Sequence, residues 1–105
     1  MYVSIAGEPT YAVIDGKWIT TTETKYGVIH RIAVAEGQTN KGLARFILEH
    51  CEQVLRGKAI PSMRIDTHED NLGMQHILKT ENYVYCGIIH LTRGSTRLAY
   101  EKIIV

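Results

Sequence analysis

Residues 28–57 read VIHRIAVAEGQTNKGLARFILEHCEQVLRG, and this stretch decides the fold. Residues 28–35 are the most apolar part of the chain, and their near-continuous pattern predicts a central strand covered on both faces. A polar loop with two glycines follows at 36–42. From Leu43 onward the apolar residues recur at steps of three and four, which predicts an amphipathic helix that ends near Gly57. A buried strand, a loop and a helix therefore follow one another directly.

The residues before this stretch have the composition of strands. Residues 2–6 form a short apolar-rich segment, and residues 17–22 are rich in β-branched side chains. Residues 11–14 are followed by Asp15 and Gly16, a dipeptide that favours tight turns because both residues tolerate a positive φ. We therefore expect a β-hairpin that turns at Asp15 and Gly16 and returns over 17–22.

The residues after the first helix predict a strand, a second helix and two more strands. The first of these strands covers 63–66, and either Asp70 or Asn71 can cap the second helix. The last two strands cover 83–89 and 97–105. The second helix directs three apolar residues inward, namely Met74, Ile77 and Leu78.

This order of strands and helices indicates one mixed α/β domain over residues 1–105, and the composition excludes several classes of function. The net charge is only +1, so we expect no nucleic-acid partner. No apolar run approaches the roughly 20 residues of a membrane span, and residues 1–6 do not resemble a secretory leader, so we expect no membrane association. Cys51 and Cys86 do not suggest a disulfide framework, which favours the cytoplasm.

The junction between the central strand and the first helix is the most informative part of the chain for chemistry. A helix N-terminus leaves backbone N–H groups unpaired and carries a partial positive charge, so the loop at 36–42 suits a phosphate or a pyrophosphate. Its spacing fits neither the Walker P-loop nor the dinucleotide-binding fingerprint. The loop alone leaves open an ordinary connection between a strand and a helix.

Residues 30–35, the loop, the sequence KGLA at 41–44 and the helix that follows resemble the acetyl-CoA-binding motif of the GNAT superfamily of acyl-CoA-dependent N-acetyltransferases. The resemblance continues through 64–71 and 83–89. It implies a GNAT-like fold with a mixed sheet. A full GNAT domain has a first strand, two helices and a further strand before this region, so we expect a domain truncated at its N-terminus. We also expect a homodimer, or an assembly in which copies exchange strands, that covers the early strands and the exposed face of the sheet.

The resemblance also implies a set of residues that bind acetyl-CoA as a co-substrate. The family's loop signature falls on 39–44, where Thr39 replaces the usual Arg or Gln. Backbone N–H groups of 40–45 would bind the pyrophosphate, the strand at 32–34 would pair with the pantetheine arm, and Asn71 would contact the same arm. The complete set is Ile32, Ala33, Val34, Asn40, Lys41, Gly42, Leu43, Ala44, Arg45 and Asn71.

For catalysis, the resemblance implies direct attack of an amine on the thioester, with proton transfer by the protein. The tyrosine that serves as the acid in the family is replaced by Leu78, so we name His68 and Tyr83 as candidate catalytic residues. His68 could act as a base because imidazole titrates near neutral pH, or it could simply belong to a solvated loop. The sequence around Asp70 fits no EF-hand, and His68 starts no zinc-protease motif, so we expect no metal.

Two functions follow from these observations. The first is an acetyl-CoA-dependent N-acetyltransferase that acts on a primary amine, carried by a small molecule or a peptide. The alternative is a catalytically inactive module, derived from the same fold, that binds CoA or another protein.

Overall fold

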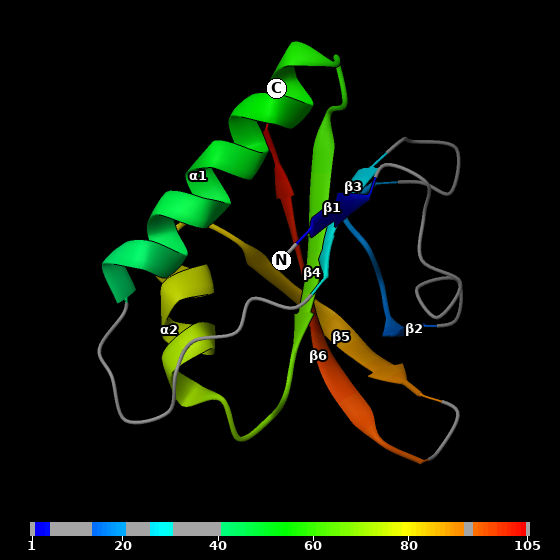
Figure 1. Cartoon of the computed structure of the whole chain (residues 1–105). Coiled ribbons are helices and arrows are strands. Elements are labelled where there is room, and N and C mark those ends of the chain that lie inside the picture. The colour runs from blue at the N-terminus through cyan, green and yellow to red at the C-terminus, as the bar shows by residue number, and fades with distance from the viewer. Residues whose placement is uncertain (1, 5–13, 21–25, 31–40, 92–93, 105) are drawn as a thin grey trace.

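The structure is a computed structural model, and it describes residues 2–4, 14–20, 26–30, 41–91 and 94–104. In this part of the chain, six strands form one sheet and two helices pack against it (Figure 1). The elements are β1 (Tyr2–Ser4), β2 (Ile14–Gly16), β3 (Tyr26–His30), α1 (Lys41–Gly57), β4 (Ser62–Thr67), α2 (Leu72–Thr80), β5 (Val84–His90) and β6 (Thr96–Ile103). The expected mixed α/β fold is confirmed.

The strands lie in the order β1-β3-β4-β6-β5-β2. Only β3 and β4 are parallel among these pairs, and α1 lies between them in the sequence. The other neighbouring strands are antiparallel. The predicted central strand is therefore an interior strand in its described part, β3, with β1 on one side and β4 on the other. Its expected continuation over 31–35 lies outside the described residues.

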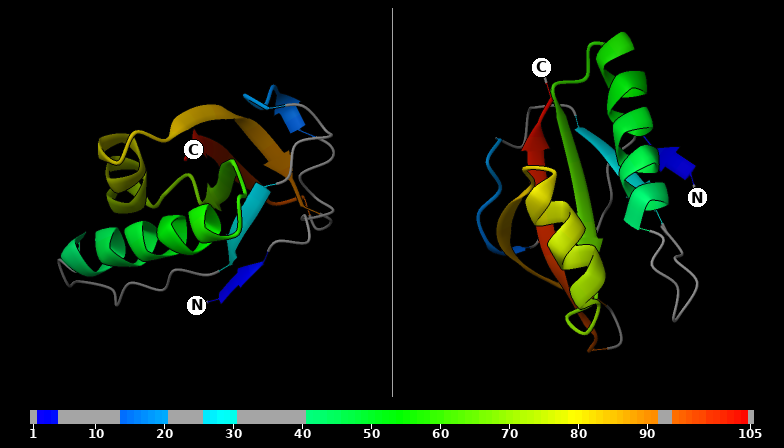
Figure 2. Two further views of the ribbon diagram at one scale, coloured as in Figure 1. Left: turned by 90° about the horizontal axis from the view of Figure 1, so that it is seen from above. Right: turned by 90° about the vertical axis from the view of Figure 1, so that its left-hand side faces the viewer.

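The two faces of the sheet carry different cores. The views in Figure 2 place α1 and α2 on one face, and side chains of both helices pack there against β4 and β6. On the opposite face, Val28, Ile89 and Ala99 form a smaller cluster. Ile14 and Trp18 pack against this smaller cluster, so the segment 14–20 covers part of the second face.

The helix α1 forms and ends as its sequence predicts. Its buried apolar residues are Ala44, Leu48, Cys51 and Leu55, at steps of three and four residues. After Gly57 two backbone hydrogen bonds end the helix. The N–H of Ile60 donates to the Leu55 carbonyl at 2.9 Å, and the N–H of Ala59 donates to the Arg56 carbonyl at 3.0 Å. This is a Schellman motif, in which Ala59 takes the left-handed conformation with φ 57.

The predicted hairpin at Asp15 and Gly16 is wrong. Both residues lie inside β2, which pairs with β5, and residues 17–20 form no strand. Gly16 is required for a different reason, because it faces Gly87 and a Cβ at Gly16 would lie 2.2 Å from the Cys86 carbonyl oxygen. Its φ of +145° also disfavours any other residue. Gly16 thus allows β2 and β5 to approach each other closely, and it does not form a turn.

The remaining elements agree with the sequence. Asn71 caps α2, and Met74, Ile77 and Leu78 are buried beneath it. Cys51 and Cys86 form no disulfide, and both are buried. Neither α1 nor α2, the helices of the described part, combines the length and the apolar character of a membrane span.

Candidate functional site

The parallel strands β3 and β4 pair over only three residues and then separate. Their register runs from Tyr26 opposite Ser62 to Val28 opposite Arg64. Beyond this point β3 continues to His30 along β1, and β4 continues to Thr67 along β6. Within the described residues, the ends of β3 and β4 therefore have no strand pairing with each other. This gap lies at the carboxyl edge of both strands.

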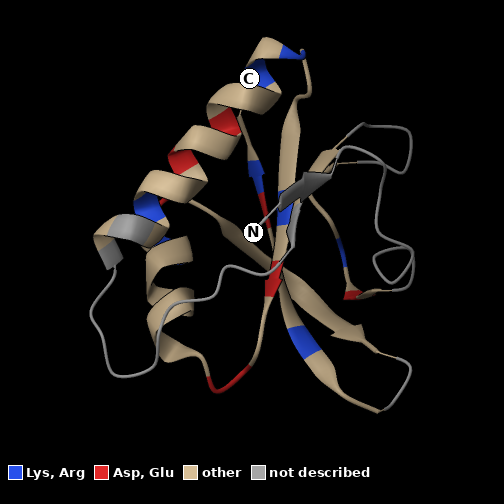
Figure 3. Ribbon diagram, viewed as in Figure 1, with Lys and Arg blue, Asp and Glu red and all other residues tan. Residues whose placement is uncertain are grey.

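The first turn of α1 has the properties of an anion site. The N–H groups of this turn have no partner within the helix, and the turn contains no acidic residue. Gly42 is exposed, and a Cβ built on it would meet no atom of the described residues within 4 Å. Ala44 packs into the core while Arg45 is exposed, so one side of the turn faces solvent. Farther along, α1 carries both acidic and basic residues (Figure 3).

Part of the predicted cofactor set can be placed. Gly42, Ala44 and Arg45 lie in the first turn of α1, together with the backbone of Lys41 and Leu43. The other members on the strand and the loop, Ile32, Ala33, Val34 and Asn40, lie outside the described residues.

The loop between β4 and α2 holds Asn71 and His68. The Asn71 side-chain oxygen accepts a hydrogen bond from the Met74 N–H at 3.1 Å, so the amide caps α2. The exposed His68 accepts the Asp70 N–H on Nδ1 at 3.0 Å, which leaves the hydrogen of the neutral imidazole on Nε2. His68 directly follows Thr67, the last residue of β4, so it lies at the edge where β3 and β4 separate.

Tyr83 lies in a different environment. Its buried hydroxyl donates to the Glu52 carboxylate at 2.9 Å and lies 3.2 Å from the Met63 sulfur. Lys102 binds the other Glu52 oxygen at 2.9 Å. Burial and the adjacent Glu52 raise the pKa of Tyr83 well above its ordinary value. Because Met63 belongs to the paired part of β4, this hydroxyl lies where β3 and β4 are still joined, and its catalytic role stays a prediction.

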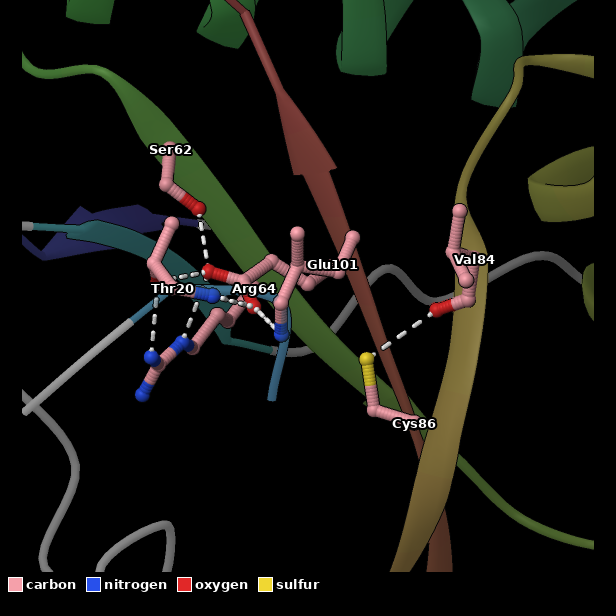
Figure 4. A network of polar contacts seen from close by, with 7 residues as sticks. Thr20, Ser62, Arg64, Val84, Cys86 and Glu101 are labelled. Carbon is pink, nitrogen blue, oxygen red and sulfur yellow. Dashed lines mark hydrogen bonds and ion pairs between the residues drawn. The ribbon is translucent and has the colours of Figure 1, made fainter. Parts of the chain in front are cut away.

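The opposite face of the sheet carries a buried polar network that the sequence does not predict (Figure 4). Arg64 on β4 and Glu101 on β6 face each other across the two strands and form an ion pair, with Nε 3.1 Å from Oε2. Glu101 is fully buried and also accepts hydrogen bonds from Ser62, from the Ile19 N–H and from Thr20. The only sequence signal is a charged residue within each predicted strand, and the sequence does not show that these two strands are neighbours.

Two aromatic rings enclose the Arg64 guanidinium. Its central carbon lies 3.9 Å from the centre of the Tyr26 ring and 4.3 Å from that of Trp18. Burial by itself would raise the pKa of Glu101, but hydrogen bonds from Ser62 and Thr20 and the charge of Arg64 outweigh it and hold the pKa below its ordinary value. The buried Glu101 carboxyl is therefore charged at neutral pH.

No cluster of three or more metal-ligating side chains occurs among the residues that the structure describes. The buried cysteines are not activated either. Burial raises the pKa of Cys51 and of Cys86, with Glu52 and Glu101 respectively adding to the effect. Among the described residues, the structure therefore shows neither a metal-binding cluster nor a thiol activated for nucleophilic attack.

Comparison with known proteins gives a family match and several similar structures. The profile of the acetyltransferase (GNAT) family matches residues 5–80. A GNAT-family acetyltransferase from Streptococcus agalactiae is similar in structure, with a TM-score of 0.78 and 39% identity over 96% of this chain and 56% of that chain. A comparison with curated proteins finds no match.

Two more distant structures share the fold. The ribosomal-protein-S18-alanine N-acetyltransferase from Escherichia coli has a TM-score of 0.61 and 18% identity, over 75% of this chain and 54% of that one. The NatC complex bound to Gag peptide and CoA contains a chain with a TM-score of 0.68 and 10% identity, over 82% of this chain and 55% of that one. The chain thus spans about half the length of the solved structures it matches.

Proposed function

The chain belongs to the acetyltransferase (GNAT) family, and from this we propose that it binds acetyl-CoA between the ends of β3 and β4 and transfers the acetyl group to a primary amine. Acetyl-CoA supplies an activated thioester, which an amine can attack directly. The acceptor would be a small molecule or a peptide. The observation that carries the proposal is the separation of β3 and β4 after Val28 and Arg64.

The gap offers backbone hydrogen bonds to an extended ligand. Residues 29–30 of β3 and 65–67 of β4 belong to strands that no longer pair with each other, although each strand keeps its outer neighbour. An arm that contains amide groups can pair with the free strand edges, as the predicted role of Ile32, Ala33 and Val34 requires. Each such hydrogen bond contributes about 0.5–1.5 kcal/mol.

The start of α1 would bind the pyrophosphate of the same ligand. The residues present fit this group, because the first turn offers N–H groups without partners inside the helix, an exposed glycine and no carboxylate. An anion at a helix N-terminus gains about 0.3–1 kcal/mol from the helix dipole alone. Asn40 to Arg45 are the proposed backbone donors, with Lys41 as a nearby cation.

For proton transfer we retain His68 and Tyr83 as the proposed groups. His68 has the more suitable position, since it lies at the carboxyl edge of β4. Its Nε2–H can stabilise a departing thiolate by a hydrogen bond, and the proton that the attacking amine loses would convert the thiolate to the free thiol. Acceptance of that proton on Nδ1 of His68 would require loss of the hydrogen bond from Asp70. We expect His68→Ala to lower the rate of acetyl transfer without changing the affinity for CoA.

Two glycines of α1 allow a matched test of the CoA site. Gly42→Ala adds a methyl group where the ligand would approach the backbone, whereas Gly57→Ala adds the same group at the other end of the helix. Neither Cβ meets an atom of the described residues within 4 Å, so both variants keep or gain stability through helix propensity. We expect calorimetry to show CoA affinity about tenfold weaker in Gly42→Ala and unchanged in Gly57→Ala. Equal affinities in the two variants, or no binding by the wild type at millimolar CoA, would contradict the proposal.

The catalytically inactive module remains a second candidate because of one observation. Leu78, which occupies the position of the family's tyrosine acid, is fully buried in the helix-side core. Release of free thiol from acetyl-CoA in the presence of amines, polyamines or peptides distinguishes the two functions. An enzyme releases thiol with at least one acceptor, whereas the module binds CoA with no turnover.

A further inference from the structure

The Arg64–Glu101 ion pair lies where β3 and β4 separate, and we infer that it sets the opening between their ends. Arg64 and Glu101 would then be positioning residues for the ligand of the proposed acetyl-CoA site, on which this inference rests. Neither residue needs to touch the ligand. Their contribution would be to hold the strand ends at the distance that an extended ligand arm requires.

Arg64 marks the end of the parallel pairing. It is the last residue of β4 with a partner on β3, namely Val28. Its guanidinium stacks on Tyr26 of β3 and on Trp18, so one side chain joins β4, β3 and the segment 14–20. The planar guanidinium can stack on rings and donate hydrogen bonds at the same time, which a lysine cannot do.

Glu101 extends the connection to β6 and fixes the segment over the sheet. Its carboxylate receives the Ile19 N–H at 2.7 Å and the Thr20 N–H at 3.2 Å. The Thr20 hydroxyl bridges the pair, because it donates to Glu101 and accepts from Arg64 Nη2 at 3.0 Å. Four parts of the chain, β3, β4, β6 and the segment 14–20, are therefore tied together at the point where the gap begins.

Such a network restricts the positions of the strands more than apolar packing would. Each hydrogen bond has a defined direction, and a buried charge that loses its partner is costly, so alternative strand positions are disfavoured. Without the network, β3 could continue to pair with β4 and close the gap, or could move away and widen it. Either change would misplace the backbone groups proposed to bind the ligand.

The first test compares two buried carboxylates on opposite faces of the sheet. Glu101→Gln weakens the network, and Glu52→Gln is the matched control because Glu52 is also buried, bound by a cation and bound by a hydroxyl. We expect Glu101→Gln to bind CoA about tenfold more weakly than the wild type. Glu52→Gln should bind CoA with little change, even if its melting temperature falls by as much as that of Glu101→Gln. Equal affinities in the two variants would overturn the inference.

A second pair of variants covers the case in which Glu101→Gln does not fold. Thr20→Val removes the bridging hydroxyl with little change in volume. Thr80→Val is the matched control, because it removes a hydroxyl that donates to the backbone carbonyl of Ile77 in α2. We expect weaker CoA binding in Thr20→Val only. In addition, Arg64→Lys should retain only part of the wild-type affinity for CoA, because lysine keeps the positive charge but cannot form the planar stack.

Hydrogen exchange in the ligand-free protein separates this inference from the proposed function. We expect the amides of residues 29–30 and 65–66 to exchange about tenfold faster in Thr20→Val than in Thr80→Val. If the wild type binds no CoA, the proposed function fails, and unequal exchange at these amides would still support control of the gap by the network. Unchanged exchange at these amides would overturn that control whether or not CoA binds.

Discussion

At the scale of single residues, two buried carboxylates have parallel roles on the two faces of the sheet. Glu52 joins α1 to Tyr83 and to Lys102 of β6 on the helix side. Glu101 joins β6 to Arg64 of β4 on the other side. Each carboxylate is satisfied by at least one cation and at least one hydroxyl, as buried charges require. The sheet is therefore held by polar contacts on both faces in addition to its apolar cores.

The lowered pKa of Glu101 predicts how stability depends on pH. A carboxyl whose pKa is lower in the folded state than in the unfolded state binds more protons when unfolded, so its stabilising contribution is present above its ordinary value of 4.5. This contribution is lost as the pH falls through the lower pKa of the folded state. We expect urea unfolding to show a loss of stability on acidification that is less steep in Glu101→Gln than in the wild type. Glu49→Gln, at an exposed position on α1, serves as the control, and an equal slope in wild type and Glu101→Gln would contradict the prediction.

At the scale of elements, both helices end in the same way. In α2, as in α1, the chain closes with a 6→1 and a 5→2 hydrogen bond, here from Tyr83 to Leu78 and from Asn82 to Lys79. Asn82 has φ 70, a conformation that asparagine tolerates. Ala59 occupies the equivalent position after α1 with φ 57, where a Cβ is unfavourable.

The C-terminal end of α1 therefore offers a stabilising substitution. Ala59→Gly removes the strained Cβ, and we expect a gain of about 0.5–1 kcal/mol in the free energy of unfolding. Lys58→Gly is the control, because Lys58 has no positive φ and therefore no strain to relieve. This substitution only raises the conformational entropy of the unfolded chain, which destabilises the folded state. Thermal unfolding should show a higher melting temperature for Ala59→Gly and a lower one for Lys58→Gly. A lower melting temperature in both would show that the left-handed residue carries no strain.

The elements that the sequence predicts well are those with local signals. The spacing of Leu48, Cys51 and Leu55 defines the buried face of α1, and a capping Asn71 defines the start of α2. The glycine at position 16 has a different kind of reason, because it allows a close approach to Gly87, which lies far along the chain. Asp15 and Gly16 are typical of turns and so predict a hairpin, but in the structure they lie inside β2.

At the scale of the whole molecule, the candidate site also has one part with a local sequence signal and one part that depends on long-range contacts. The start of α1 could be located from the sequence because a loop and a helix adjoin there. The contact between Arg64 and Glu101 could not, because it depends on β4 lying next to β6, and strand order is a property of the folded sheet. Long-range pairing thus decides both the width of the proposed ligand gap and the residues that support it.

The outer surface of β5 leads to a prediction about assembly. Val84 and Tyr85 are each 51% exposed and line a hollow of about 550 Å³ between α2 and the sheet. Exposed apolar side chains that cluster around a hollow are typical of interaction surfaces, so we propose that a second copy of the chain binds here as a homodimer. Light scattering at micromolar concentration should give the mass of a dimer for the wild type and of a monomer for Tyr85→Lys.

Phe46 on α1 provides the control for this interface. Its ring is 65% exposed and stacks only on His50 among the ring contacts of the described residues, so it offers similar apolar area away from the hollow. We expect Phe46→Lys to remain a dimer, because α1 would lie outside the interface. Dissociation by Phe46→Lys but not by Tyr85→Lys would place the interface on α1 instead. A monomeric wild type would refute the homodimer itself, and the proposed CoA site, which uses only residues of one chain, would be unaffected.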